Sequence, residues 1–205
     1  MISLILTTLF ALFPIVDPPG TIPLFLSMTE GDSEAVRRKQ ALKGCIYMVC
    51  ILITFLLFGT LIMQYFGLSF PGLRIAGGFL LCKFGLQMLY PARKQITSFE
   101  LEESRHKDDI SFFPLALPYL AGPGAIAATM TLSTLTATPL GYVAISTGIL
   151  ILGVITYFTL RFASHIAKLL GLTGMNAVTK VMGFIIFALG IQFIINGILQ
   201  LYPNK

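Results

Sequence analysis

Apolar residues dominate this chain in long runs, and polar residues are confined to the short segments between the runs. Six runs are long and apolar enough to cross a hydrocarbon core of about 30 Å: residues 2–28, 41–66, 71–90, 110–135, 139–163 and 178–201. The pattern therefore predicts an all-α membrane protein with six transmembrane helices and little chain left for a soluble domain.

The composition agrees with this fold class and narrows the choice of partners. Apolar residues make up 56% of the 205 residues and charged residues 11%, whereas soluble domains carry about 25% charged residues. The net charge of +5 is no sign of nucleic-acid binding, because the basic residues lie beside the apolar runs, where positive charge sets membrane orientation. We expect lipids as partners and no nucleic acid.

The distribution of basic residues predicts the orientation. Six crossings place the segments after the first, third and fifth runs on one side of the membrane. Eleven of the 14 Lys and Arg residues lie on that side, Arg74 and Lys205 lie opposite, and Lys83 lies inside a run. Because positive loops stay in the cytoplasm, we expect both termini in the periplasm of a bacterial inner membrane. The same count disfavours re-entrant hairpins in the first and fourth runs.

The first run contains a cluster of helix-breaking residues. The stretch "FPIVDPPGTIPLF", residues 13–25, holds four prolines, Gly20 and Asp17. Proline lacks a backbone donor and clashes with the preceding turn. Since an unwound turn at membrane depth is tolerated only in contact with protein or a polar cavity, the first helix is expected to be discontinuous.

The second half of the chain repeats this pattern. A shift of 104 residues lays "PIVDPPGTI" (14–22) on "PYLAGPGAI" (118–126), and a shift of 105 lays "GFLLCKFGLQML" (78–89) on "GFIIFALGIQFI" (183–194). A unit of three crossings reverses its own direction, so the halves form a 3+3 inverted repeat with a discontinuous fourth helix. We expect residues 1–91 and 110–205 as the two repeats, joined by a cytoplasmic linker at 92–109.

The two interruptions predict a substrate site near the membrane midplane, because interrupted spans in inverted halves mark such sites in transporters. Free N–H groups after Gly20 and Gly124 suit a carboxylate, and carbonyls before the breaks suit an ammonium group or cation. The alternative is a pair of proline-kinked helices that bind nothing. The candidate substrate-binding residues are Asp17, Pro18, Pro19, Gly20, Thr21, Gly122, Pro123, Gly124 and Ala125.

Asp17 and Lys83 are the charged residues placed at membrane depth by this scheme, and such residues are functional candidates. One hypothesis is a charge pair. Another is that Asp17 alone holds a substrate amine or carries a coupling proton, with sodium as the other possible coupling ion. The structural alternatives are a helix-capping role for Asp17 and a Lys83 side chain that snorkels into a wet vestibule.

Four stretches resemble the MarC family of bacterial inner-membrane proteins, which includes the SnatA-type transporters: "IVDPPGTIPLFL", "GLRIAGGFLL", "PLALPYLAGPGAIA" and "MGFIIFALGIQFIINGI". The resemblance spans essentially the whole chain in the same order. It implies six spans, a bacterial cytoplasmic membrane and transport of small neutral amino acids such as glycine and alanine. Carried over by motif, it places residues 17–20 and 122–124 at the substrate site.

Other functional classes are disfavoured by the motifs. The chain has no HExxH, no GxSxG and no membrane-embedded aspartate pair, so we do not expect an enzyme, a metal site or a cofactor. An aquaporin-like channel is the main competitor, because interrupted inverted halves also describe such pores. Its Asn-Pro-Ala donors are absent. A MarC-type protein that does not transport amino acids is the other alternative.

Overall fold

The computed structural model describes residues 1–90, 109–136 and 138–201. Over these residues every regular element is helical: α1 (Ile2–Val16), α2 (Pro18–Met28), α3 (Glu34–Tyr65), α4 (Phe70–Leu89), η1 (Ser111–Leu120), α6 (Pro123–Ser133), α7 (Pro139–Arg161) and α8 (Ala163–Leu201). Five helical segments, with α1 and α2 taken as one, are long and apolar enough to cross a membrane. The bent pair of η1 and α6 raises that number to six if it forms one span.

Short polar side chains start three of the long helices. The hydroxyl groups of Ser33, Ser69 and Thr138 accept hydrogen bonds from backbone N–H groups three residues later, at the starts of α3, α4 and α7. Proline occupies the first turn of α4 and α7, where its missing N–H costs nothing. These caps explain why the apolar runs become helices at these residues.

Two segments expected to be loops are helical. The basic residues Arg37, Arg38 and Lys39 lie on the first turns of α3. The region between the fifth and sixth predicted spans belongs to α8, which changes direction at Gly171, whose φ is 62°. Positive φ is readily accessible to glycine, so the chain turns there without strain. The predicted linker at 92–109 lies outside the described residues except for Asp109.

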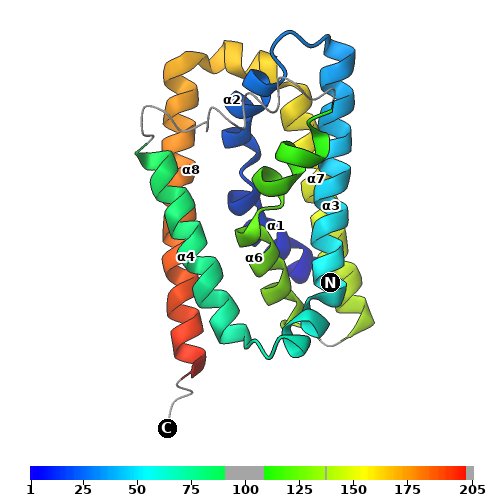
Figure 1. Cartoon of the computed structure of the whole chain (residues 1–205), viewed down its shortest axis with the longest axis vertical. Helices are drawn as coiled ribbons and strands as arrows, with labels where there is room; N and C mark the ends of the chain where they lie inside the picture. The colour runs from blue at the N-terminus through cyan, green and yellow to red at the C-terminus, as the bar shows by residue number, and fades with distance from the viewer. Residues whose placement is uncertain (91–108, 137, 202–205) are drawn as a thin grey trace.

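The long helices pack in two pairs at opposite edges of the molecule (Figure 1). α4 lies along α8 at one edge of the molecule, and α3 packs against α7 at the other edge. The broken segments α1–α2 and η1–α6 lie between these two pairs. The interruptions therefore occupy the interior of the bundle.

The α4–α8 contact is close because glycine lies at the crossing points. A methyl group built on Gly78 would lie 2.6 Å from the carbonyl oxygen of Gly190, and one on Gly85 would lie 2.6 Å from that of Gly183. The two helices are therefore antiparallel. Small residues permit this backbone approach, which is typical of packed membrane helices.

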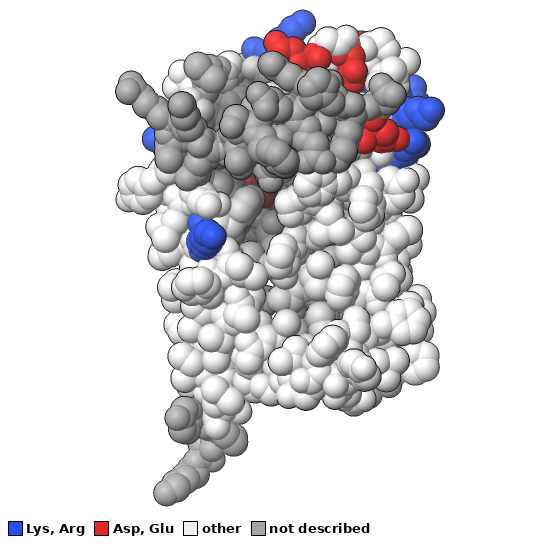
Figure 2. Space-filling model, in the orientation of Figure 1, with Lys and Arg blue, Asp and Glu red and all other residues white. Residues whose placement is uncertain are grey.

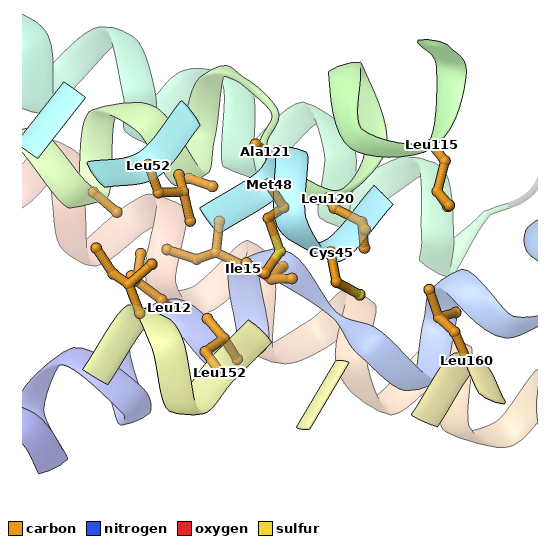
Figure 3. Packing of buried hydrophobic residues seen from close by; sticks show 14 of the residues in the cluster. Leu12, Ile15, Cys45, Met48, Leu52, Leu115, Leu120, Ala121, Leu152 and Leu160 are labelled. Carbon is orange, nitrogen blue, oxygen red and sulfur yellow. The ribbon is translucent and has the colours of Figure 1, made fainter. Parts of the chain in front are cut away.

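A continuous apolar core joins the two halves (Figure 3). Its fully buried members include Leu12 of α1, Met48 and Leu52 of α3, Leu120 of η1 and Leu152 of α7. The outer surface is also apolar, with large exposed side chains such as Phe79 and Phe184. An apolar exterior of this extent is expected where lipid rather than water surrounds a protein.

Charged side chains are concentrated at one end of the molecule. In Figure 2 the basic and acidic side chains gather mainly at the upper end, and the lower part of the described surface in this view is uncharged. Figure 1 places the start of α3 and the end of α2 at that end. The charge distribution thus separates a polar end from a long apolar section.

Candidate functional site

Asp17 separates α1 from α2 and holds the backbone in the left-handed region, with φ 46° and ψ 64°. Among non-glycine residues, aspartate and asparagine tolerate this conformation best. The Asp17 N–H donates to the Phe13 carbonyl at 3.0 Å and so ends α1. The Gly20 N–H donates to Asp17 Oδ1 at 3.1 Å and so begins α2. One residue caps both helices.

The sequence around Asp17 explains this break. Pro18 and Pro19 have no N–H groups to donate to α1, so the helix cannot continue through them. The same prolines are suited to the first turn of α2, where N–H groups have no partners inside the helix. Thr21 reinforces the turn, because its backbone N–H and its hydroxyl both donate to the Asp17 carbonyl, at 3.1 Å and 2.9 Å.

The second interruption has a different form. η1 contains extended backbone at Phe113 and Leu117, and the axes of η1 and α6 meet at 62°. Gly122 caps α6 without a side-chain hydrogen bond. Ala121, which aligns with Asp17 in the repeat, is fully buried and apolar. The two breaks are therefore chemically unequal.

Tertiary packing brings the two breaks near each other. A methyl group built on Gly124 would lie 2.6 Å from Leu81 Cδ2 and 3.7 Å from Ile15 Cγ2. Gly124 opens α6, and Ile15 lies two residues before Asp17. Leu81 of α4 fills the space over Gly124, so the second break is packed shut against apolar side chains.

A cavity of about 160 Å³ lies at the first break. It is smaller than the ~300 Å³ at which pockets for drug-sized ligands begin. Figure 2 shows this face of the molecule hollowed, with an acidic side chain in its depth. Residues of both halves line the cavity: Val16, Asp17, Gly20, Thr21, Leu24, Phe84, Met88, Tyr119 and Thr179.

The predicted site residues separate into two groups in the structure. Asp17, Gly20 and Thr21 line the cavity. The remaining candidates are not among the residues that line it: Pro18, Pro19, Gly122, Pro123, Gly124 and Ala125. Pro18 and Pro19 shape the break instead, and Gly124 packs against Leu81.

Sequence reasoning missed several side chains that complete the cavity. Phe84 and Met88 lie four residues apart on one face of α4, Tyr119 belongs to η1, and Thr179 belongs to α8. The only sequence signal among these is Tyr119, which lies inside the repeated "PYLAGPG" stretch. The others were not recognisable, because the sequence around them does not indicate which face of α4 or α8 contacts the break.

The structure does not bring Lys83 to Asp17. Lys83 is exposed, whereas its neighbours Leu81 and Cys82 are buried. Within the described residues no ion pair joins Lys83 to Asp17. Lys83 lies on a different face of α4 from Phe84 and Met88, since successive helical residues are about 100° apart. Asp17 thus lies in the cavity without a basic side chain from the described lining.

Arg37 ties the charged end of the bundle together. Its guanidinium donates to the hydroxyl and carbonyl of Thr29, each at 3.0 Å, and to the Ser164 hydroxyl at 3.1 Å. Thr29 ends α2 and is fully buried, and Ser164 lies at the start of α8. Arg37 therefore holds the end of the cavity-lining α2 against α3 and α8.

Comparisons with known proteins agree with this architecture. Residues 2–202 match the model of the MarC family, described as integral membrane proteins. Relatives from Escherichia coli K12, Escherichia coli O1:K1 and Shigella flexneri, each named inner membrane protein MarC, are 37% identical over 205 residues, which covers 94% of this chain and 93% of each relative. No solved structure matches this chain significantly. The chain is therefore a multi-pass inner-membrane protein that belongs to the MarC family.

Proposed function

We propose that this protein is a transporter of small neutral amino acids of the glycine and alanine class. The observation that carries the proposal is the cavity at the interrupted first helix, where the buried carboxyl group of Asp17 meets side chains from both halves. Interrupted helices at the interface of two repeats are the usual location of transporter substrate sites. The small volume suits a solute of only a few non-hydrogen atoms.

The transport proposal includes a 3+3 inverted repeat related by an axis in the membrane plane. Helix packing supports it, because α3 contacts its repeat counterpart α7, α4 contacts its counterpart α8, and the contact of α1 with α6 has its equivalent in the contact of η1 with α2. The glycine contacts support it further. The repeat aligns Gly78 with Gly183 and Gly85 with Gly190, so exchange of the halves converts the Gly78–Gly190 contact into the Gly85–Gly183 contact.

The proposed orientation places the charged end of the bundle in the cytoplasm and both termini in the periplasm. The support is the excess of Lys and Arg that follows the ends of α2, α4 and α7. This orientation can be tested with variants of the protein that carry a single cysteine, either near Met1 or at Ser33. Intact cells that produce them are treated with a positively charged, thiol-reactive reagent that cannot cross the membrane. Labelling at Ser33 rather than near Met1 would contradict the orientation.

Transport in proteoliposomes tests the main proposal. We expect saturable uptake of radiolabelled glycine and alanine, inhibition by unlabelled alanine, and little uptake of leucine. The Asp17→Asn variant should lose most of the uptake, whereas Asp109→Asn, a matched change outside the cavity, should retain it. Uptake that rises linearly with alanine concentration would indicate a channel instead, and absence of uptake under every gradient would contradict transport of these amino acids.

The coupling ion is part of the same measurement. Asp17 is the carboxyl group among the described residues of the cavity lining, so we propose that a proton or sodium ion binds there during the cycle. Uptake driven by a pH gradient without sodium favours the proton, and uptake that requires a sodium gradient favours sodium. Equal uptake without either gradient would contradict coupling.

A further inference from the structure

We propose that the cavity recognises the ammonium group of its ligand through Asp17 and makes no specific contact with a carboxylate, so that it binds small primary amines as well as amino acids. This inference deepens the proposed transport function and rests on it for the identity of the natural ligand. Its geometric basis lies in the Asp17 carboxyl group, the first turn of α2 and the rest of the cavity lining.

The Asp17 carboxyl group is buried but only half satisfied. Its residue is 3% exposed. Oδ1 accepts the Gly20 N–H, and within the described chain no hydrogen bond reaches Oδ2. A methyl group built on Gly20, which lines the cavity, would overlap Oδ2. Oδ2 therefore occupies the cavity side of the α2 first turn. Oδ2 is not fully enclosed by protein, so a donor group of a ligand in the cavity can reach it.

The first turn of α2 is unavailable to a ligand carboxylate. Its N–H groups were expected to bind one, but the Gly20 N–H is bonded to Asp17 Oδ1 and the Thr21 N–H to the Asp17 carbonyl. Pro18 and Pro19 contribute no N–H groups at all. The protein's own aspartate thus occupies the anion position at this helix N-terminus, and a second carboxylate beside it would meet like-charge repulsion.

The rest of the described lining lacks a positively charged group for a carboxylate. Among the residues that the structure describes, no Lys, Arg or His lines the cavity. The α6 N-terminus, the second predicted anion site, is not part of the lining, and Gly124 is covered by Leu81. The described lining consequently offers a carboxyl group and no positively charged side chain.

The hydroxyl groups near Asp17 suit an ammonium group. Thr21 uses its hydroxyl hydrogen to donate to the Asp17 carbonyl at 2.9 Å, so its oxygen is left with acceptor capacity. Thr179, which also has a hydroxyl group, lines the cavity too. An ammonium group has three donors and no acceptor. It therefore matches a site composed of a carboxylate oxygen and hydroxyl oxygens.

Of the two aligned interruptions, only the first carries this chemistry. The positions that align with Asp17 and Thr21 are Ala121 and Ala125, both buried and without polar side-chain atoms. The two interruptions therefore supply a single acidic group between them. We infer a binding stoichiometry of one amine for each chain.

Ligand pairs that differ in one charged group test this inference on purified protein. Alaninamide keeps the amine and lacks the carboxylate, propionate keeps the carboxylate and lacks the amine, and alanine has both. We expect alanine and alaninamide, but not propionate, to bind by calorimetry and to raise the unfolding temperature. In Asp17→Asn we expect affinity for both amines to fall at least roughly tenfold, with Asp109→Asn unchanged.

The possible outcomes separate the two proposals. Propionate that binds as tightly as alaninamide, or alaninamide binding that persists in Asp17→Asn, overturns the inference. Alanine binding without alaninamide binding overturns the inference and leaves the transport proposal intact. Alaninamide binding without alanine binding supports recognition of the amine but overturns both the binding of amino acids and the transport proposal, and binding of neither overturns both proposals. The wild-type comparison of the three ligands is decisive even if Asp17→Asn fails to fold.

Discussion

The backbone N–H of Gly20 donates to Asp17 Oδ1 at 3.1 Å, and Asp17 Oδ2 occupies the place where a Gly20 side chain would begin. The absence of a side chain at Gly20 is thus what allows the carboxyl group to fold over the first turn of α2. Asp17 and Gly20 therefore lie at the helix break, form the cap of α2 and line the cavity.

Gly20→Ala tests this relation. The added methyl group would displace the Asp17 carboxyl group, so we expect alanine uptake in proteoliposomes to fall at least about tenfold, the loss that removal of a charge-assisted contact causes. Size-exclusion chromatography checks that the variant is folded. Unchanged uptake by a folded Gly20→Ala protein would contradict the placement of the carboxyl group.

Met88 is expected to limit ligand size. Its Cβ packs against Gly183 while the side chain lines the cavity. Met88→Ala keeps Cβ and removes the outer atoms, so inhibition of alanine uptake by leucine should strengthen by roughly tenfold or more. Leu86→Ala, on the exposed side of α4, is the matched control. Equal leucine inhibition in both variants would show that Met88 does not restrict the cavity.

Close packing of α4 on α8 predicts that added volume destabilises the protein. Gly85→Ala would place a methyl group 2.6 Å from both Gly183 O and Phe187 N, and backbone atoms cannot yield without moving the helices. We expect a cost of about 1–3 kcal/mol, seen as a drop of several degrees in the unfolding temperature in detergent. Leu86→Ala, the control, should lower the unfolding temperature less. A Gly85→Ala protein as stable as the wild type would contradict this close crossing of α4 and α8.

Arg37 is expected to contribute more to stability than its neighbour Arg38. Arg37→Ala removes the bonds to Thr29 and Ser164 and leaves the buried Thr29 carbonyl without this partner. The expected loss is about 1–3 kcal/mol. Arg38 makes an exposed bond to the Tyr157 hydroxyl at 3.2 Å, so Arg38→Ala should cost less than about 1 kcal/mol. Equal unfolding temperatures for the two variants would contradict this ranking.

We expect Asp109 to make a small contribution to stability that depends on pH. Partial burial alone would raise its pKa, but hydrogen bonds from Lys43 and Ser111 outweigh burial and lower the pKa from 3.8 to about 2. The salt bridge to Lys43, at 2.5 Å, lies at the surface and is screened by solvent.

Because the folded-state pKa is depressed, the Asp109 contribution is full above about pH 4 and is lost as the pH falls toward 2. We expect wild-type protein to unfold at a slightly higher temperature than Asp109→Asn at pH 6. The difference should vanish near pH 2 in the same detergent. A difference that persists at low pH would show that another property of Asp109 causes it.

Much of this architecture is readable from the chain itself. Runs of about 20 apolar residues require helices, since lipid offers no partners for backbone N–H and C=O groups. Pro18 and Pro19 prevent α1 from continuing, because they have no backbone N–H to donate. The end of α1 near Asp17 is therefore predictable from the sequence. Asp17 also stood out because a carboxyl group in an apolar run is costly.

What the chain alone did not determine is which side chains meet at the break. Phe84 rather than Lys83 faces the cavity because α4 packs its glycines against α8, and that contact sets the rotation of the whole helix. Tyr119 and Thr179 reach the same cavity from segments far away in sequence. Helix formation depends on neighbours along the chain, whereas the cavity depends on how helices rotate and pack, and only the tertiary structure decides that.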